Sequence, residues 1–419
     1  ENKMESITNL IVPPDECFYV YEDVIDDYYD KDICPKELIV PNKVGETNIT
    51  QISYQDCYST TFQCMGAFES KKIMGAFESK KIKKAIISNG ITKINKNSFN
   101  DNNLVDITIP TSVISIEEYA FSNNNLKNVT ILNGVNTIGE RAFRNNKITS
   151  ITLPKSVNYI GKEAFNVNNL PNSQAFIYKR NSDGNEDKTT VIGYGGKSKD
   201  VIIPDNITSI GAYAFANCNL ENVTIPNSIT SIGKGAFSSN NLTNITIPDG
   251  VTSIESETFY NCQSLSNIDI SNSLISIGMD AFAHCKNLKN IKIPDSVTTI
   301  ELGAFNDTLW YNNQPDGLLY AGKVLYLYKG EMPENTKITL KNDTSGIADN
   351  AFSYCTNLTN IKIPDSVTII GAWAFFSCPN LTAIEIPSSV IGIGVYALLG
   401  CGNLTIYGNI GSYAESYAN

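Results

Sequence analysis

The sequence predicts an α/β or mainly β solenoid, in which coils of 22–23 residues stack to form a parallel sheet. The phrase at residues 241–254, NLTNITIPDGVTSI, recurs with small changes through most of the 419 residues. Phenylalanine recurs at one place in each copy, in steps of 22 or 23 residues. Before it, isoleucines alternate with polar residues, which is the period of a β-strand. Units this short must stack in order to bury their apolar faces.

Composition excludes some classes of function. The net charge is −11, from 43 acidic and 32 basic residues, and the arginines are Arg141, Arg144 and Arg180. Nucleic-acid binding depends mainly on basic residues that neutralise phosphates, so this balance disfavours it. No run of about 18 apolar residues occurs, which argues against a membrane-spanning helix and against direct membrane insertion.

Residues 1–64 differ from the rest, and we predict that they form an N-terminal cap before a solenoid at 65–419. Residues 37–41, ELIVP, resemble the repeated strand, whereas the acidic run at 22–32 is interpreted as a solvated loop. Residues 1–5 lack the features of a signal peptide, so the chain is either cytosolic or a mature fragment. Two disulfides with three possible connectivities are left open for four cysteines: Cys17, Cys34, Cys57 and Cys64.

A nine-residue duplication precedes the regular repeats. Residues 65–73 reappear unchanged at 74–82. Phe77 lies 22 residues before Phe99, so the second copy is in frame with the coils. We interpret the first copy as a non-functional local duplication, either looped out or an artefact.

The repeated phenylalanines fix the frame of the coils and reveal two inserts. Two steps are longer than one coil, which places inserts at about 171–198 and 309–336. Each insert reads as a β-hairpin, because strand-like runs flank a turn-rich segment. The predicted hairpin strands are 176–180 with 189–194, and 318–320 with 324–328. The repeat positions are Phe77, Phe99, Phe121, Phe143, Phe165, Phe215, Phe237, Phe259, Phe282, Phe305, Phe352, Phe375 and Leu398.

Each coil is predicted to contain a main strand, a shorter strand and a turn. In the phrase above, Leu242, Ile245 and Ile247 point inward, and Pro248 ends the strand because it lacks a backbone donor. Val251 and Ile254 form a second apolar pair. A glycine follows in many coils, where we expect a turn with positive φ. Examples are Gly211, Gly233, Gly278 and Gly371.

These patterns resemble the BspA-like leucine-rich repeats of bacterial surface proteins. Coils such as residues 358–375, LTNIKIPDSVTIIGAWAF, carry the resemblance, which covers about 77–407. It implies a right-handed leucine-rich-repeat superhelix on a secreted or cell-surface protein. Characterised members are associated with adhesion to host matrix, host cells or other bacteria. Residues 1–64 fall outside the resemblance.

The position three residues after the repeat phenylalanine, here named the Asn/Cys slot, holds asparagine or cysteine in most coils. A slot that accepts both needs a small polar side chain facing the coil backbone, so we interpret its cysteines as buried, inert thiols. The asparagines are Asn102, Asn124, Asn146, Asn168 and Asn240. The cysteines are Cys218, Cys262, Cys285, Cys355, Cys378 and Cys401.

No residue set in the sequence predicts catalysis, a cofactor or a metal site. His284 is the one histidine, and it occupies a variable repeat position. No Cys-x-x-Cys pair occurs, and the acidic run at 22–32 lacks the spacing of a calcium loop. Residues 193–196 lack the Lys-Ser/Thr of a phosphate-binding loop. We therefore expect a non-enzymatic protein without a cofactor.

The outer face of the main strands supplies the candidate binding residues. If isoleucines point inward, the polar residues between them point outward and form columns along the stack. The alternative is that threonine simply suits strands. Charge enters these columns in the later coils, which places a partner there. The candidates are Asn244, Thr246, Asn267, Asp269, Asn290, Lys292, Asn360, Lys362 and Glu385.

The second insert adds three aromatic candidates, Trp310, Tyr311 and Tyr326. Such residues often anchor interfaces. They could equally pack the hairpin onto the solenoid, and the sequence leaves both possibilities open.

The leading hypothesis is an extracellular or cell-surface protein that binds a protein or glycan through its solenoid face. The alternative is a passive structural spacer of the cell envelope or of a surface appendage. The hypothesis depends on the repeat array and on the absence of a recognisable set of catalytic residues in the sequence.

Overall fold

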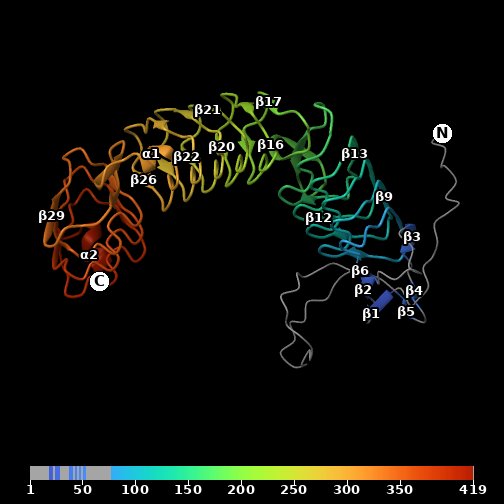
Figure 1. Cartoon of the computed structure of the whole chain (residues 1–419), viewed down its shortest axis with the longest axis horizontal. Coiled ribbons are helices and arrows are strands. Elements are labelled where there is room, and N and C mark those ends of the chain that lie inside the picture. The colour runs from blue at the N-terminus through green and yellow to red at the C-terminus, as the bar shows by residue number, and fades with distance from the viewer. Residues whose placement is uncertain are drawn as a thin grey trace. The chain divides into compact units, whose positions relative to one another are not determined.

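The computed structural model describes residues 77–418 and the backbone of six strands nearer the N-terminus. The chain forms two compact units, residues 1–198 and residues 199–419. Within each unit, consecutive coils lie next to one another (Figure 1). Each regular coil contributes one main strand, one two-residue strand and one turn that carries the repeat phenylalanine. The predicted β-solenoid is therefore confirmed.

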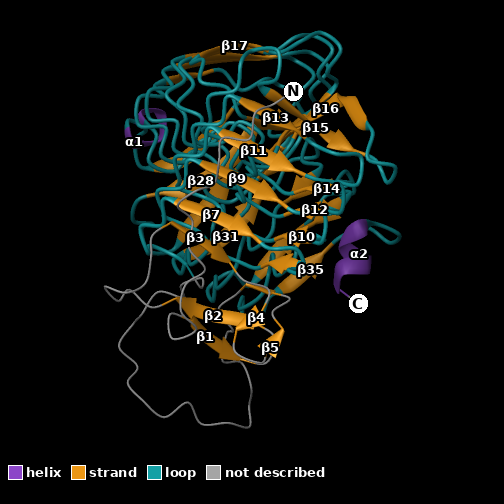
Figure 2. Ribbon diagram, turned by 90° about the vertical axis from the view of Figure 1, so that its right-hand side faces the viewer, coloured by secondary structure: helices purple, strands orange, loops and turns teal. Residues whose placement is uncertain are grey.

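In the first unit, main strands β9, β11 and β13 form a parallel, in-register sheet, and main strand β7 pairs with β3 (Glu37–Val40) (Figure 2). Asn128 of β11 lies opposite Asp106 of β9 and Ser150 of β13, so equivalent residues of successive coils are aligned. The alternating isoleucines bring this about, because a shift of one residue would expose them. These main strands are β7 (Lys84–Ile87), β9 (Asp106–Ile109), β11 (Asn128–Ile131) and β13 (Ser150–Thr152).

Six N-terminal strands are described by their backbone. β3 (Glu37–Val40) pairs in parallel with β7, which confirms that this segment resembles the repeated strand. β2 (Val24–Tyr28) pairs antiparallel with β1 (Phe18–Tyr21), so the prediction of a loop is wrong there. Its valine, isoleucine and tyrosine favour a strand despite the acidic neighbours. The others are β4 (Lys43–Val44), β5 (Thr47–Asn48) and β6 (Gln51–Ile52). The predicted boundary at residue 64, the first duplicate copy and the pairing of the four cysteines lie outside the described residues.

The second unit contains nine main strands in parallel groups. They are β17 (Asp200–Ile202), β19 (Asn222–Thr224), β21 (Asn244–Ile247), β23 (Asn267–Ile270), β25 (Asn290–Ile291), β29 (Thr336–Thr339), β31 (Leu358–Lys362), β33 (Ala383–Glu385) and β35 (Thr405–Tyr407). Two short helices are present in the described residues, α1 (Leu309–Asn312) and α2 (Tyr413–Ala418).

The predicted second strand of each coil is two residues long. Its second residue is an isoleucine that points into the core. In the first unit these strands are β8 (Lys93–Ile94), β10 (Ser115–Ile116), β12 (Thr137–Ile138) and β14 (Tyr159–Ile160). In the second unit they are β18 (Ser209–Ile210), β20 (Ser231–Ile232), β22 (Ser253–Ile254), β24 (Ser276–Ile277), β26 (Thr299–Ile300), β30 (Gly346–Ile347), β32 (Ile369–Ile370) and β34 (Gly392–Ile393).

Both inserts contain the predicted antiparallel hairpins. β15 (Phe176–Arg180) pairs with β16 (Glu186–Tyr194), which begins three residues before the predicted strand. β27 (Gly317–Ala321) pairs with β28 (Val324–Lys329) across a two-residue turn. The start of β28 also pairs in parallel with β30, so this hairpin is built into the sheet of short strands.

A ladder of phenylalanine rings runs through the core. Neighbouring rings from Phe77 to Phe165 are stacked with centroids 4.8–5.4 Å apart. Those from Phe215 to Phe305 are 5.3–5.7 Å apart. Phe77 stacks on Phe99 and is fully buried, which confirms that the second copy of the duplication is in frame.

The Asn/Cys slot faces the backbone, as predicted. Asn124 Nδ2 donates to the carbonyl oxygens of Phe99 (2.9 Å) and Phe121 (3.2 Å). In a later coil, Cys378 Sγ donates to the carbonyl oxygen of Phe352 at 3.1 Å. In such coils the slot ties the coil to the one before it.

The expected role of the coil glycines is wrong. Gly233, Gly278 and Gly371 do not have positive φ. Instead, a Cβ on Gly233 would lie 2.7 Å from the backbone nitrogen of Ala212, and one on Gly278 would lie 2.5 Å from that of Ser256. These glycines are needed because successive coils approach each other closely there. Positive φ occurs two residues before and after the repeat phenylalanine, as at Tyr213 and Asn217.

The three arginines hold the first unit together. Arg141 and Arg144 both pair with Glu163, whose side chain is fully buried, with nitrogen–oxygen distances of 2.5 and 3.3 Å. Arg180 of β15 donates to the carbonyl oxygens of Pro154 and Val157 at 2.8 and 3.0 Å. Their guanidinium groups are thus engaged in internal contacts.

Candidate functional site

The outer columns of the main strands are exposed, as the alternation predicted. In β21, Ile245 and Ile247 are 4% and 2% exposed, whereas Asn244 and Thr246 face solvent. The same pattern holds in the later coils, because each strand has one face on the core. All nine column candidates are exposed: Asn244, Thr246, Asn267, Asp269, Asn290, Lys292, Asn360, Lys362 and Glu385.

Parallel registration aligns four different side chains across the last four main strands. Thr339 of β29 lies opposite Lys362 of β31. Lys362 lies opposite Glu385 of β33, and Glu385 lies opposite Tyr407 of β35. A hydroxyl, an ammonium, a carboxylate and a phenol therefore follow one another across the sheet.

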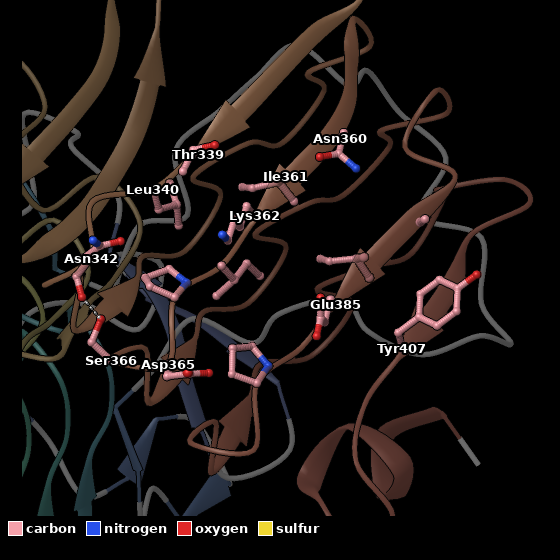
Figure 3. Close-up of a pocket in the computed structure, with 15 residues that line it drawn as sticks. Thr339, Leu340, Asn342, Asn360, Ile361, Lys362, Asp365, Ser366, Glu385 and Tyr407 are labelled. Atoms are coloured by element: carbon pink, nitrogen blue, oxygen red, sulfur yellow. Dashed lines mark hydrogen bonds between the residues drawn. The ribbon is translucent and has the colours of Figure 1, made fainter.

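A groove of about 750 Å³, here named the Lys362 groove, lies over these strands. Figure 3 shows Lys362, Glu385 and Tyr407 on neighbouring strands along it. The structure thus brings together three of the predicted residues, Asn360, Lys362 and Glu385. The other polar and aromatic side chains that line the groove are Thr339, Asn342, Asp365, Ser366 and Tyr407.

The charged groups of the Lys362 groove are available to a partner. Within residues 77–418, neither Lys362 nor Glu385 forms an ion pair, although they occupy facing positions. Tyr407 is 57% exposed. Ser366, by contrast, is occupied, since its hydroxyl donates to the carbonyl oxygens of Asn342 and Thr344 at 2.8 and 2.7 Å.

A second, more open groove of about 430 Å³, here named the Trp310 groove, lies over β23 and β25. It collects four more of the predicted residues, Asn267, Asn290, Lys292 and Trp310. Its other lining residues are Ile268, Lys289 and Ile291. The remaining column candidates, Asn244, Thr246 and Asp269, line neither groove.

The aromatic candidates of the second insert have different roles. Tyr326 is only 2% exposed, and its hydroxyl accepts a hydrogen bond from the Phe305 backbone nitrogen at 3.2 Å. Tyr326 therefore packs the hairpin onto the solenoid, and its place among the partner-binding candidates is wrong. Tyr311 is half-buried, with Lys329 Nζ 5.0 Å from its ring centroid. Trp310 is half-buried at the edge of its groove.

Among residues 77–418, no serine, threonine or cysteine side chain hydrogen-bonds to the histidine. His284 Nδ1 lies 3.0 Å from Asp307 Oδ2, and its ring meets the edge of Tyr260. Nucleophilic catalysis needs a base within hydrogen-bonding reach of the nucleophile. In the described part of the chain, no group of three or more His, Cys, Asp or Glu residues is arranged to hold a metal ion.

Three charged or aromatic groove residues were missed by the sequence analysis. Tyr407 could have been found, because it continues the outward column after Lys362 and Glu385. Asp365 and Lys289 lie outside the strand columns, so the alternation pattern gave no sign of them. They enter the grooves only because the turns beside the strands fold next to the sheet.

The comparisons with known proteins agree with the repeat frame. The family model of BspA-type leucine-rich repeat regions (six copies) matches residues 71–177, 194–310 and 326–411. The chain belongs to the BspA-type leucine-rich-repeat family. No curated protein sequence matches this family member.

Several solved bacterial structures are similar to this BspA-type chain. A leucine-rich repeat protein of Eubacterium ventriosum is 21% identical, with a TM-score of 0.41 over 78% of this chain and 85% of that one. One of Bacteroides ovatus is 22% identical, with a TM-score of 0.32 over 88% and 91%. A leucine-rich cell surface protein of Faecalibacterium prausnitzii is 19% identical, with a TM-score of 0.34 over 96% and 94%.

The BspA-type solenoid has little helix. Neither of the helices in the described residues has the length and apolar character needed to cross a lipid bilayer.

Proposed function

We propose that this chain is a non-enzymatic binding protein of the bacterial cell surface that holds a macromolecular partner, a protein or a glycan, across β29, β31, β33 and β35. The observation that carries the proposal is the Lys362 groove. It combines an unpaired ammonium, an unpaired carboxylate and an exposed phenol in one row. Charged groups left without internal partners are available to recognise complementary groups.

The architecture around the groove supports this proposal. Its row of side chains comes from paired strands rather than from loops, and rigid elements position binding groups with less loss of entropy on association. Tyr407 offers a large amphipathic side chain of the type that often anchors interfaces. Membership of a family named for bacterial repeat regions, and similarity to a protein described as a leucine-rich cell surface protein, support a surface location.

The proposal is tested by measuring binding to panels of matrix proteins and glycans by surface plasmon resonance. For a partner found in this way, we expect Lys362→Ala, Glu385→Ala and Tyr407→Ala each to weaken binding about tenfold or more, about 1.4 kcal/mol. Lys337→Ala is the matched control, because Lys337 is exposed on β29 but does not line the groove.

The contrary outcome is a passive spacer. If no panel member binds the folded chain, or if the three groove variants bind as well as the Lys337→Ala control, the proposed function is wrong.

A further inference from the structure

The Trp310 groove is separate from the Lys362 groove. It lies over β23 and β25, whereas the Lys362 groove lies over β29 to β35, and the two share no lining residue. Its chemistry also differs. Lysine is the only charged residue type lining the Trp310 groove, whereas the Lys362 groove contains carboxylates as well.

The indole is held in place before any ligand arrives. The Trp310 backbone nitrogen donates to the carbonyl oxygen of Leu288 at 2.7 Å, and the ring centroid lies 5.0 Å from that of Phe305. Thr308 caps the N-terminus of α1, because its hydroxyl oxygen accepts from the Tyr311 backbone nitrogen at 3.1 Å. Trp310 is therefore a fixed aromatic wall, which lowers the entropy cost of binding against it.

A half-buried set of hydrogen bonds supports the same helix. Lys329 Nζ donates to the carbonyl oxygens of Tyr311 at 3.0 Å and Gln314 at 2.5 Å. A cation is favourable at the carbonyl end of a helix. Lys329 therefore fastens the hairpin to α1 and is part of the framework of the groove.

Two other lysines supply the charge. Lys289 and Lys292 are exposed, and within the described residues neither forms an ion pair. Asp269 lies on β23 but does not line the groove. On a chain with a net charge of −11, two lysines without a lining carboxylate form a local site of opposite sign. Such a site favours an anionic ligand.

Two amides also line the groove. Asn267 and Asn290 face each other across the paired strands. Asn267 Nδ2 donates to Asn244 Oδ1 at 3.1 Å, which orients its amide. An amide both donates and accepts hydrogen bonds. This property matches ligand hydroxyl groups, which also do both, whereas an ionised carboxylate only accepts.

We propose that the Trp310 groove binds an acidic saccharide, a sugar unit that carries a carboxylate. The lysines pair with the carboxylate, the amides meet hydroxyl groups, and the indole covers the apolar face of the ring. An acidic peptide would satisfy the lysines but would offer few hydroxyls to the two amides. This site is independent of the Lys362 groove, so the proposed function can fail while this proposal holds.

The experiment uses the intrinsic fluorescence of Trp310. The chain has two tryptophans, so Trp373→Phe leaves Trp310 as the single reporter. We titrate this variant with galacturonate oligomers and 3′-sialyllactose, and with galactose oligomers and lactose as neutral controls. Saturable fluorescence changes are expected with the acidic probes alone. They should weaken as salt is added, because salt screens exposed charges.

The matched substitutions locate the site. Lys289→Gln with Lys292→Gln, made in the Trp373→Phe background, should weaken binding of the acidic probes about tenfold or more, since hydrogen bonds to charged groups are the stronger ones. Lys337→Gln is the control, because Lys337 is an exposed strand lysine that lines neither groove. It should leave binding unchanged. Both changes lie on exposed side chains, and circular dichroism checks that each variant is folded.

Each other outcome overturns the proposal. Equal binding of neutral and acidic sugars would show that charge is not recognised. Binding of a polyglutamate peptide without binding of the sugars would assign the site to acidic peptides instead. An equal loss with Lys337→Gln would place the ligand elsewhere, and no response to any probe would leave the groove without this function.

Discussion

In most coils, the leucine that follows the Asn/Cys slot has a backbone amide that needs a hydrogen-bond acceptor. The coils around Asn124 and those around Cys378 provide this acceptor in different ways. In the first kind, the acceptor comes from the next coil. The Leu104 backbone nitrogen donates to Asn124 Oδ1 at 3.0 Å, and the Leu126 nitrogen donates to Asn146 Oδ1 at 3.1 Å. The asparagine thus acts as a donor to phenylalanine carbonyls and as an acceptor for the preceding leucine.

In the second kind, the acceptor comes from the same coil. The Leu358 backbone nitrogen donates to the Cys355 carbonyl oxygen at 3.1 Å, and the Leu381 nitrogen donates to that of Cys378 at 3.1 Å. An extra residue between the slot and the leucine makes this turn possible. The next slot then needs only a donor, which the thiol of Cys378 or Cys401 supplies.

The comparison shows that coil length and slot residue are coupled. Where the leucine follows its slot by two residues, the next slot is asparagine after Asn102, Asn124, Asn146 and Cys218, but cysteine after Asn240 and, beyond the first insert, after Asn168. Where it follows by three, the next slot is never asparagine in the described coils. Cys218 tests the rule. Leu220 follows it by two residues, and its backbone nitrogen donates to Asn240 Oδ1 at 3.0 Å.

The largest effect should come from what both kinds of coil share. Phe121→Ala and Phe375→Ala each remove a fully buried ring, and we expect each to lower the free energy of unfolding by about 3–5 kcal/mol. Phe376→Ala is the control, because Phe376 is only half-buried and should cost much less. Urea denaturation measures all three. Similar costs for Phe375→Ala and Phe376→Ala would contradict the assigned frame.

Asn124→Cys should show how much stability the acceptor contributes in the asparagine kind of coil. It removes the acceptor of the buried Leu104 backbone nitrogen, and we expect a loss of about 2–4 kcal/mol from the unsatisfied donor and the lost hydrogen bonds. Asn125→Cys makes the same chemical change at a half-buried neighbour and should cost under about 1 kcal/mol. Equal costs in urea denaturation would show that the acceptor is unimportant.

The buried thiols should make stability depend on alkaline pH. Burial raises the pKa of Cys262 to about 12 and that of Cys355 to about 11. Since the folded state keeps the proton, each thiol stabilises the fold fully below the ordinary cysteine pKa and loses this contribution as pH rises towards the raised value. Between pH 8 and pH 10 we expect the wild type to lose about 1 kcal/mol more than Cys262→Ser. Identical losses of unfolding free energy for the two proteins, measured by urea denaturation, would contradict this prediction.

The smallest effect should come from Cys378→Ser. The slot after Phe305 already holds Thr308, whose hydroxyl donates to the Phe305 carbonyl oxygen at 2.8 Å. Thr308 uses the carbonyl of its own coil, whereas Cys378 uses that of Phe352 in the preceding coil. A serine hydroxyl can donate to a phenylalanine carbonyl as well, so the change in unfolding free energy should stay below about 1 kcal/mol. Asn124→Ser should cost more, because one short hydroxyl would replace the separate Nδ2 donor and Oδ1 acceptor of the amide. Thermal unfolding of both variants would reveal a reversed order.

Most of the fold could be predicted from the sequence because one spacing determines it. The period of Phe237 and its equivalents fixes the frame, and the alternation around Thr246 decides which side chains face solvent. Both patterns depend on local geometry, which repeats in every coil. The role of Gly233 was missed, because the approach of Ala212 involves a different coil and leaves no local signature.

The candidate site was only partly predictable for the same reason. Lys362 and Glu385 lie in strand columns, and the sequence places them correctly on the outer face. The burial of Tyr326 depends instead on how the second hairpin folds back onto Phe305. The position of Trp310 depends on a short helix that tertiary contacts stabilise. Such contacts between distant segments cannot be deduced from periodicity.

The hydrogen bond from the Leu104 backbone nitrogen to Asn124 also affects the order in which the coils can fold. When a coil of this kind leaves the ribosome, one of its backbone amides has no acceptor within the protein. It gains one only after the following coil has been synthesised and docked. Neighbouring coils should therefore open and close together, as one cooperative block in native-state hydrogen exchange. A coil with the Cys355 arrangement forms this hydrogen bond within the same coil. Its region of the solenoid should therefore open in smaller cooperative units during hydrogen exchange.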